Sequence, residues 1–112
     1  MKIVQRTESD VTVFRPEGRI DWSSLSEFSS ALNRSIQEGA KKVLIDFSQT
    51  DYMSSAGLRA LTDLLKQMEE AGGEIALCSL NESLKELFRI VNFDKVFTIY
   101  ENEFEALDRM SA

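Results

Sequence analysis

The residues best placed for chemistry are two adjacent serines, Ser54 and Ser55, in the middle of the chain. An apolar segment typical of a buried strand, residues 43–45, precedes them, and apolar side chains at helical spacing follow them. The serines are therefore predicted to lie at the start of a helix, where a hydroxyl can accept a hydrogen bond from a free backbone N–H. Gly57 lies in the first turn of that helix and leaves the backbone open to close approach.

The composition argues against catalysis by these serines. The chain contains no histidine, which excludes Ser-His-Asp and Cys-His arrangements, and it has no Gly-x-Ser-x-Gly motif. A serine hydroxyl without a base is a weak nucleophile. No set of residues has metal-ligand spacing, and no Gly-rich phosphate loop is present. We therefore expect no enzyme activity, no metal and no cofactor. An enzyme with an unrecognised serine site stays as an alternative.

The bulk properties indicate one small cytoplasmic domain. The chain has 112 residues, 43% hydrophobic and 29% charged, which suits one domain over residues 1–112. Its net charge of −6 argues against nucleic acid and anionic lipid as partners. No apolar run approaches the ~20 residues of a membrane helix, and the N-terminus lacks a signal-peptide core. The single cysteine, Cys78, excludes an internal disulfide and is interpreted as a small core residue.

The pattern of elements predicts an α/β fold. Residues 3–6 and 11–15 are predicted to form an antiparallel hairpin, and Pro16 is expected to end its second strand. Strands and helices then alternate, which predicts parallel right-handed crossovers and, with the hairpin, a mixed sheet. The expected elements are a helix from a Ser24–Glu27 capping box to Gly39, a strand 43–47, a loop 48–54, a helix to Ala71, a strand 75–78, a helix from Asn81, a strand 96–100 and a helix from Asn102. Val91 and Phe104 are expected to face inward on the last two helices.

Several segments resemble the STAS domain family, in particular the bacterial anti-sigma factor antagonists. The resemblance rests on Asp46-x-Ser48 and the run from Tyr52 to Leu58, and it extends to residues 18–21, 72–73, 87–88 and 92–97. In that family the serine at the position of Ser55 is phosphorylated by a kinase that is also the anti-sigma factor. Many members have aspartate in place of Ser54 and a second serine in place of Ala56, so Ser54 is the reserve phosphorylation site.

The resemblance implies a STAS fold and a function in partner switching. The unphosphorylated chain would bind the anti-sigma factor and free the sigma factor, phosphorylation would end binding, and a PP2C-type phosphatase would reset the chain. ATP and Mg²⁺ would belong to the kinase. The alternative is a STAS scaffold subunit of a stress-signalling or transporter complex that does not switch.

The predicted partner-binding residues surround the two serines. They are Asp21, Met53, Ser54, Gly57, Leu58 and Arg59. Each has a plainer interpretation: Asp21 as a helix cap, Met53 and Leu58 as core or half-core residues, Gly57 as a close-packing residue, and Arg59 as a solvated side chain. Trp22 is either an interface anchor or a cover over one end of the core.

Overall fold

In the computed structural model, which describes residues 1–111, the chain begins with an antiparallel hairpin. Strand β1 (Lys2–Glu8) pairs with β2 (Val11–Ile20) along its whole length. The predicted hairpin is therefore confirmed, but β2 continues past Pro16 instead of ending there. Pro16 is tolerated because β2 leaves its parallel neighbour β3 at Phe14 and meets β4 only at Gly18, so a missing N–H costs no bond on that side.

The rest of the sheet is parallel. The strand order is β1-β2-β3-β5-β6, and β4 pairs with the second half of β2 outside this path. The remaining strands are β3 (Lys42–Asp46), β4 (Thr50–Met53), β5 (Glu74–Cys78) and β6 (Thr98–Tyr100). The helices are α1 (Leu25–Gln37), α2 (Ser55–Glu70), α3 (Glu82–Ile90), a short 3₁₀ helix (Phe93–Lys95) and α4 (Glu103–Met110).

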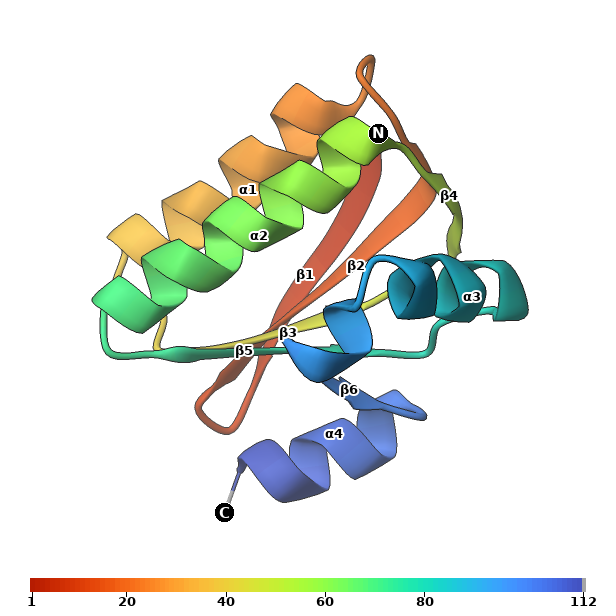
Figure 1. Cartoon of the computed structure of the whole chain (residues 1–112). Coiled ribbons are helices and arrows are strands. Elements are labelled where there is room, and N and C mark those ends of the chain that lie inside the picture. The colour runs from red at the N-terminus through yellow and green to blue at the C-terminus, as the bar shows by residue number, and fades with distance from the viewer. Residues whose placement is uncertain (112) are drawn as a thin grey trace.

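The sheet is covered on both faces, which confirms the α/β fold (Figure 1). Helices α1 and α2 lie side by side on one face with α3 beyond them, and α4 lies on the other face. The buried apolar residues form two clusters, and alternate residues of β3 belong to different ones. Val43 and Ile45 belong to the larger cluster, whereas Leu44 packs with Ala106 and Met110 of α4. This continuous apolar run is typical of a parallel strand buried on both faces. Among the described residues, no helix combines the length and the apolar character that crossing a bilayer requires.

The helix starts agree only in part with the sequence. Asn81 and Asn102 cap α3 and α4 as predicted, with side chains that accept from the Leu84 and Glu105 N–H groups. The predicted Ser24 capping box is wrong. Ser24 occupies the cap position, but its Oγ donates to the Arg19 carbonyl oxygen, and Glu27 instead binds the terminal amino group of Met1.

Two side chains expected inward face solvent. Phe104 on α4 is 83% exposed and Val91, just after α3, is 37% exposed. Other residues fill the inner positions, with Ala106 and Met110 buried under α4 and Leu84 and Phe88 under α3. A helix of two turns has too few positions for periodicity alone to fix its inner face.

A carboxyl pair fixes the start of α4 against the sheet. Asp46 is 5% exposed at the end of β3 and accepts a hydrogen bond from the Ser48 N–H, and Arg6 binds Glu103. A hydrogen bond shared with Asp46 raises the pKa of Glu103. Burial alone would raise the pKa of Asp46, but hydrogen bonds from Glu103 and Ser48 bring it below its ordinary value. Within the pair, Glu103 therefore binds a proton more readily than Asp46 does.

Asp46→Asn is expected to lower the pKa of Glu103, because the amide donates to a carboxylate and removes the neighbouring acid. A pKa raised by folding gives stability at low pH that is lost as pH rises through the folded value, so the part of this loss that comes from Glu103 should be smaller in the variant. Carboxyl-carbon NMR titration and urea unfolding across pH measure both effects. Arg6→Met is the control, and it should raise the pKa of Glu103, because the Arg6 hydrogen bond lowers this pKa. An unchanged Glu103 titration in Asp46→Asn would contradict the assignment.

Candidate functional site at the start of helix α2

The two serines have different roles at the junction of β4 and α2. Ser54 has an extended backbone and is the N-cap, and its Oγ accepts a hydrogen bond from the Gly57 N–H at 3.3 Å. Ser55 is the first residue of the helix and is exposed. The helix start was predicted correctly, and the structure assigns the capping role to Ser54. Of the two hydroxyls, that of Ser55 has no part in capping the helix among the described contacts.

Strand β4 replaces most of the predicted loop 48–54. Thr50 is buried and its Oγ1 donates to the Pro16 carbonyl oxygen, while the Gly18 N–H donates to the Gln49 carbonyl oxygen. The register with β2 shifts between Gly18 and Arg19, and Gly18 has a φ of +98° that favours glycine. These bonds fix the segment that leads into Ser55.

Gly57 lets α2 pack closely against the end of β2. A Cβ at this position would lie 2.7 Å from Met53 Cγ and 3.0 Å from Ile20 Cγ2. The Ser54 N–H also donates to the Ile20 carbonyl oxygen at 2.9 Å. The start of α2 and the end of β2 therefore form one rigid unit, and Gly57 and Met53 shape the site from beneath.

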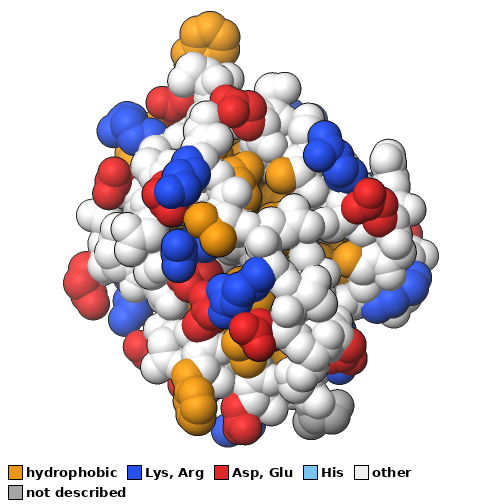
Figure 2. All heavy atoms as spheres, turned by 180° about the vertical axis from the view of Figure 1, so that it is seen from behind, with side chains coloured by type: hydrophobic (Ala, Val, Ile, Leu, Met, Phe, Trp, Pro, Cys, Tyr) orange, Lys and Arg blue, Asp and Glu red, His pale blue; other side chains and the backbone are white. Residues whose placement is uncertain are grey.

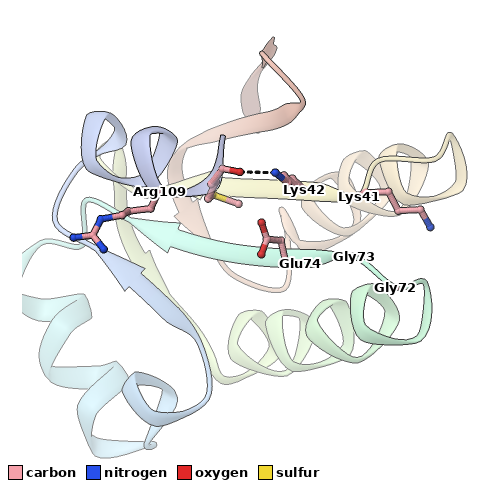
Figure 3. A pocket seen from close by; sticks show the side chains of 7 residues that line it. Lys41, Lys42, Gly72, Gly73, Glu74 and Arg109 are labelled. Atoms are coloured by element: carbon pink, nitrogen blue, oxygen red, sulfur yellow. Dashed lines mark hydrogen bonds between the residues drawn. The ribbon is translucent and has the colours of Figure 1, made fainter. Parts of the chain in front are cut away.

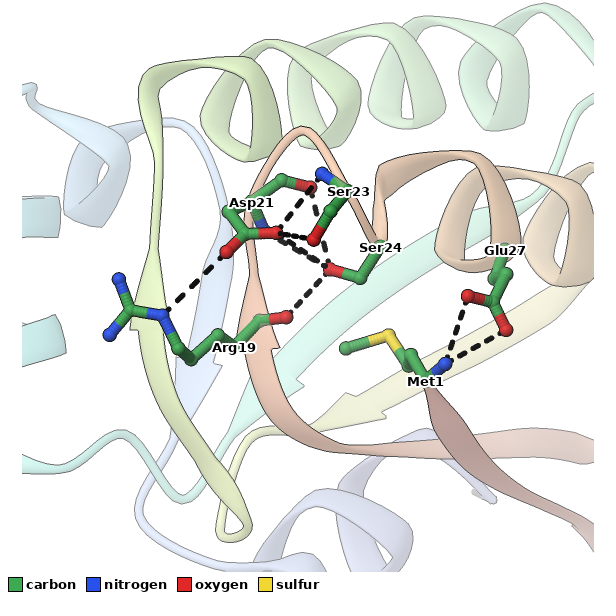
Figure 4. A network of polar contacts seen from close by, with 6 residues as sticks. All are labelled: Met1, Arg19, Asp21, Ser23, Ser24 and Glu27. Carbon is green, nitrogen blue, oxygen red and sulfur yellow. Dashed lines mark hydrogen bonds and ion pairs between the residues drawn. The ribbon is translucent and has the colours of Figure 1, made fainter.

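Asp21 organises the loop that follows β2 (Figure 4). Its Oδ1 accepts from both the N–H and the hydroxyl of Ser23, and these bonds hold the pKa of Asp21 below its ordinary value. Ser24 Oγ accepts from the Asp21 N–H while donating to the Arg19 carbonyl oxygen. Asp21 therefore stabilises the turn before α1, and its Oδ2 lies 3.6 Å from Arg19 Nε.

Arg19 links this loop to a shallow cavity beside Ser55. Its guanidinium lies 4.2 Å from the centre of the Tyr52 ring. The cavity has a volume of about 370 Å³ and is bounded by β4, the first turn of α2 and α3. Its lining is Asp51, Tyr52, Met53, Ser55, Leu58, Ser83, Leu84 and Leu87. An edge-to-face series of aromatic rings from Phe47 through Phe88 to Phe93 supports α3 from below.

The predicted site residues thus gather at one end of the molecule, with different exposure. Asp21, Ser54 and Leu58 are half-buried, whereas Ser55 and Arg59 are exposed. The sequence analysis did not single out Arg19 as a site residue or Leu87 as a wall of the cavity. Both lie in segments that carry the resemblance, residues 18–21 and 87–88, but they join the site through pairing and packing between distant segments.

A larger cavity, of about 500 Å³, lies at the opposite edge of the sheet, where β3 and β5 begin (Figure 3). Its cations do not converge on a common point: Lys41 and Arg109 extend away from each other, and Lys42 Nζ donates to the Met110 carbonyl oxygen at 2.6 Å. Within residues 1–111, no group of three or more acidic or cysteine side chains has the geometry to hold a metal ion. The end with Ser55 is at the carboxyl edge of the parallel strands, where sites of open α/β sheets usually lie.

Comparison with known proteins gives a consistent result. Residues 2–106 match the family model described as the STAS domain. BtrV of Bordetella bronchiseptica, which its name describes as a candidate anti-sigma factor antagonist, is 30% identical over 83 residues, covering 74% of this chain and 72% of that protein. A candidate anti-sigma factor antagonist from Thermotoga maritima has a TM-score of 0.90 at 22% identity, covering 96% of this chain and 92% of that one.

The Bacillus anti-sigma factor antagonist SpoIIAA has the same fold. Its unphosphorylated form gives a TM-score of 0.78 at 17% identity, covering 97% of each chain. Its phosphorylated form gives 0.76 at 18% identity, covering 97% of this chain and 99% of that one. These structures establish the fold alone, and the match over residues 2–106 establishes the family. The chain belongs to the STAS domain family.

Proposed function

We propose that this chain is a cytoplasmic anti-sigma factor antagonist that works as a single STAS domain. In its unphosphorylated state it binds an anti-sigma factor with serine kinase activity, and phosphorylation of Ser55 ends that binding. It acts by binding and not by turnover. The kinase brings its own ATP and Mg²⁺, and a PP2C-type phosphatase resets the chain.

The observation that carries the proposal is the contrast between the two serines. Ser55 is exposed at the first position of α2, whereas the Oγ of Ser54 is occupied as the helix cap. A kinase needs an accessible hydroxyl, and Ser54 would have to give up its cap bond to become one. Such a bond contributes about 1 kcal/mol. This contrast supports Ser55 over the reserve site Ser54.

The position of Ser55 also suits a charge switch. A phosphate adds roughly −1.5 to −2 charges at neutral pH. The start of a helix tolerates an anion, because its free N–H groups and dipole stabilise one by about 0.3–1 kcal/mol. The first turn of α2 contains no acidic residue that would repel the phosphate. The cost of the new charge therefore falls on the closed interface with the partner and not on the fold.

A protein with the same fold supports regulation by phosphorylation. SpoIIAA, an anti-sigma factor antagonist, exists in an unphosphorylated and a phosphorylated form with this fold. The predicted interface comprises Asp21, Ser54, Leu58 and Arg59 around Ser55, with Met53 and Gly57 supporting them from beneath. If the chain were a scaffold subunit that does not switch, the exposed Ser55 hydroxyl would have no function.

The direct test is the intact mass of the protein purified from its native cells under phosphatase inhibition, with fragmentation to locate any modification. We expect one phosphate on Ser55, none on Ser55→Ala, and continued modification of Ser54→Ala. A phosphate that disappears only in Ser54→Ala would move the site. If no phosphate appears in any growth or stress condition, the switch is wrong and the scaffold role takes its place.

A further inference from the structure

Trp22 is the sole tryptophan of the chain and is 84% exposed. It does not cover the core, so the alternative interpretation of the sequence, as a cover over one end of the core, is wrong. Seen from behind, the surface has mixed charges, and one hydrophobic side chain stands out at the end where the loop between β2 and α1 lies (Figure 2). A large apolar side chain held in water is unfavourable for the free chain.

The loop around Trp22 is held in one conformation. The Ser24 and Leu25 N–H groups both donate to the Asp21 carbonyl oxygen. The bonds between the side chains of Asp21, Ser23 and Ser24 close the turn on both sides of Trp22 (Figure 4). An indole on an ordered turn loses little conformational entropy when a partner covers it.

Trp22 is also continuous with the surface around Ser55. Asp21 is its neighbour in the chain, Arg19 pairs with Asp21, and the Arg19 guanidinium covers the ring of Tyr52. Tyr52 and Ser55 line the same cavity. We call this surface, made of Trp22, Asp21, Arg19, Tyr52, Ser55 and Leu58, the Trp22–Ser55 strip.

We propose that Trp22 is the apolar anchor of the interface with the anti-sigma factor, which covers the Trp22–Ser55 strip as one surface. The inference rests on the proposed function and adds to it the residue that holds the partner beside the switch. The partner should present an apolar pocket for the indole, next to acceptors for the Arg19 guanidinium. Tryptophan and arginine are enriched among residues that dominate binding energy.

Binding of the purified anti-sigma factor kinase tests the anchor by calorimetry. Trp22→Ala is expected to raise the Kd about 30-fold, the effect of a strong interface residue, with no change in melting temperature because the side chain makes no core contact. Phe104→Ala is the matched control. Phe104 is 83% exposed on α4, at the far end of the molecule, and its replacement should leave the Kd unchanged.

A second readout follows the indole itself. Incorporation of 5-fluorotryptophan places one ¹⁹F resonance in the chain, at Trp22. On addition of the partner, this resonance should lose its H₂O/D₂O solvent shift, because the indole becomes buried. A resonance that stays solvent-sensitive in the saturated complex would overturn the proposal.

The outcomes separate the two proposals. If Trp22→Ala binds like the wild type while Ser55→Asp does not bind, the anchor is wrong and the switch stands. If Ser55→Asp binds like the wild type while Trp22→Ala binds weakly, the switch is wrong and the anchor stands. If sedimentation shows a dimer that Trp22→Ala abolishes and the partner affinity is unchanged, the indole binds a second copy of this chain and the anchor is wrong. If the wild type binds no anti-sigma factor kinase, both proposals fall.

Discussion

Ser55→Asp is expected to weaken binding of the anti-sigma factor by at least about 100-fold, because an unpaired carboxylate in a closed interface costs several kcal/mol, at ~1.4 kcal/mol per tenfold. The melting temperature of the free chain should stay almost unchanged. Ser55 is exposed, and a negative charge at the start of α2 is stabilised by the helix dipole. Calorimetric titration with the partner and thermal unfolding of the free chain measure the two expectations separately.

Ser55→Asn is the matched control for that substitution. It has nearly the same shape as the aspartate but no charge, so it should retain most of the binding if charge is the cause. Equal loss in both variants would indicate that the interface tolerates no larger side chain at this position. Wild-type affinity in Ser55→Asp, or a large fall in its melting temperature, would contradict the proposed switch.

Gly57→Val is expected to destabilise the protein by about 3 kcal/mol and to displace the start of α2. The first added carbon alone would lie 2.7 Å from Met53 Cγ and 3.0 Å from Ile20 Cγ2. Overpacking of a filled core typically costs about 1–3 kcal/mol, and valine adds two further carbons. Urea unfolding measures the loss, and partner binding should weaken as well, because Ser54 and Ser55 move with the helix.

The control for the helix propensity of valine is Gln67→Val, on the exposed side of the same helix. It introduces the same β-branched side chain without a close contact and should change the free energy of unfolding by less than about 1 kcal/mol. If Gly57→Val proved as mild as this control, α2 would be able to move away from β2, and the rigid junction between Ser54 and Ile20 would be wrong.

Most of the fold could be predicted because its signals are local. The apolar strand around Leu44, the Asn81 and Asn102 caps, and the glycine at position 39 that ends α1 all depend on neighbouring residues. The helix start at Ser54 and Ser55 belongs to the same class. The position of the candidate site therefore followed from the sequence.

The parts that could not be predicted depend on distant partners. Strand β4 exists because β2 extends past Pro16 and offers it a ladder, and neither segment shows this alone. Ser24 and Glu27 match a capping box in the local sequence, but the Ser24 hydroxyl donates to the carbonyl oxygen of Arg19 in strand β2, which the local sequence does not reveal. The exposure of Trp22 and Phe104 depended on which elements cover each end of the sheet, which composition does not reveal.

The separate pairing of β4 has a consequence for access to Ser55. Strand β4 contacts the sheet only through the second half of β2, outside the path of the five other strands. Thr50 and Met53 of this strand are buried, and the Ser54 N–H donates to the Ile20 carbonyl oxygen, so the position of the segment before Ser55 depends on β2. A kinase would therefore meet the exposed Ser55 hydroxyl on an ordered segment that is held by one strand of the sheet.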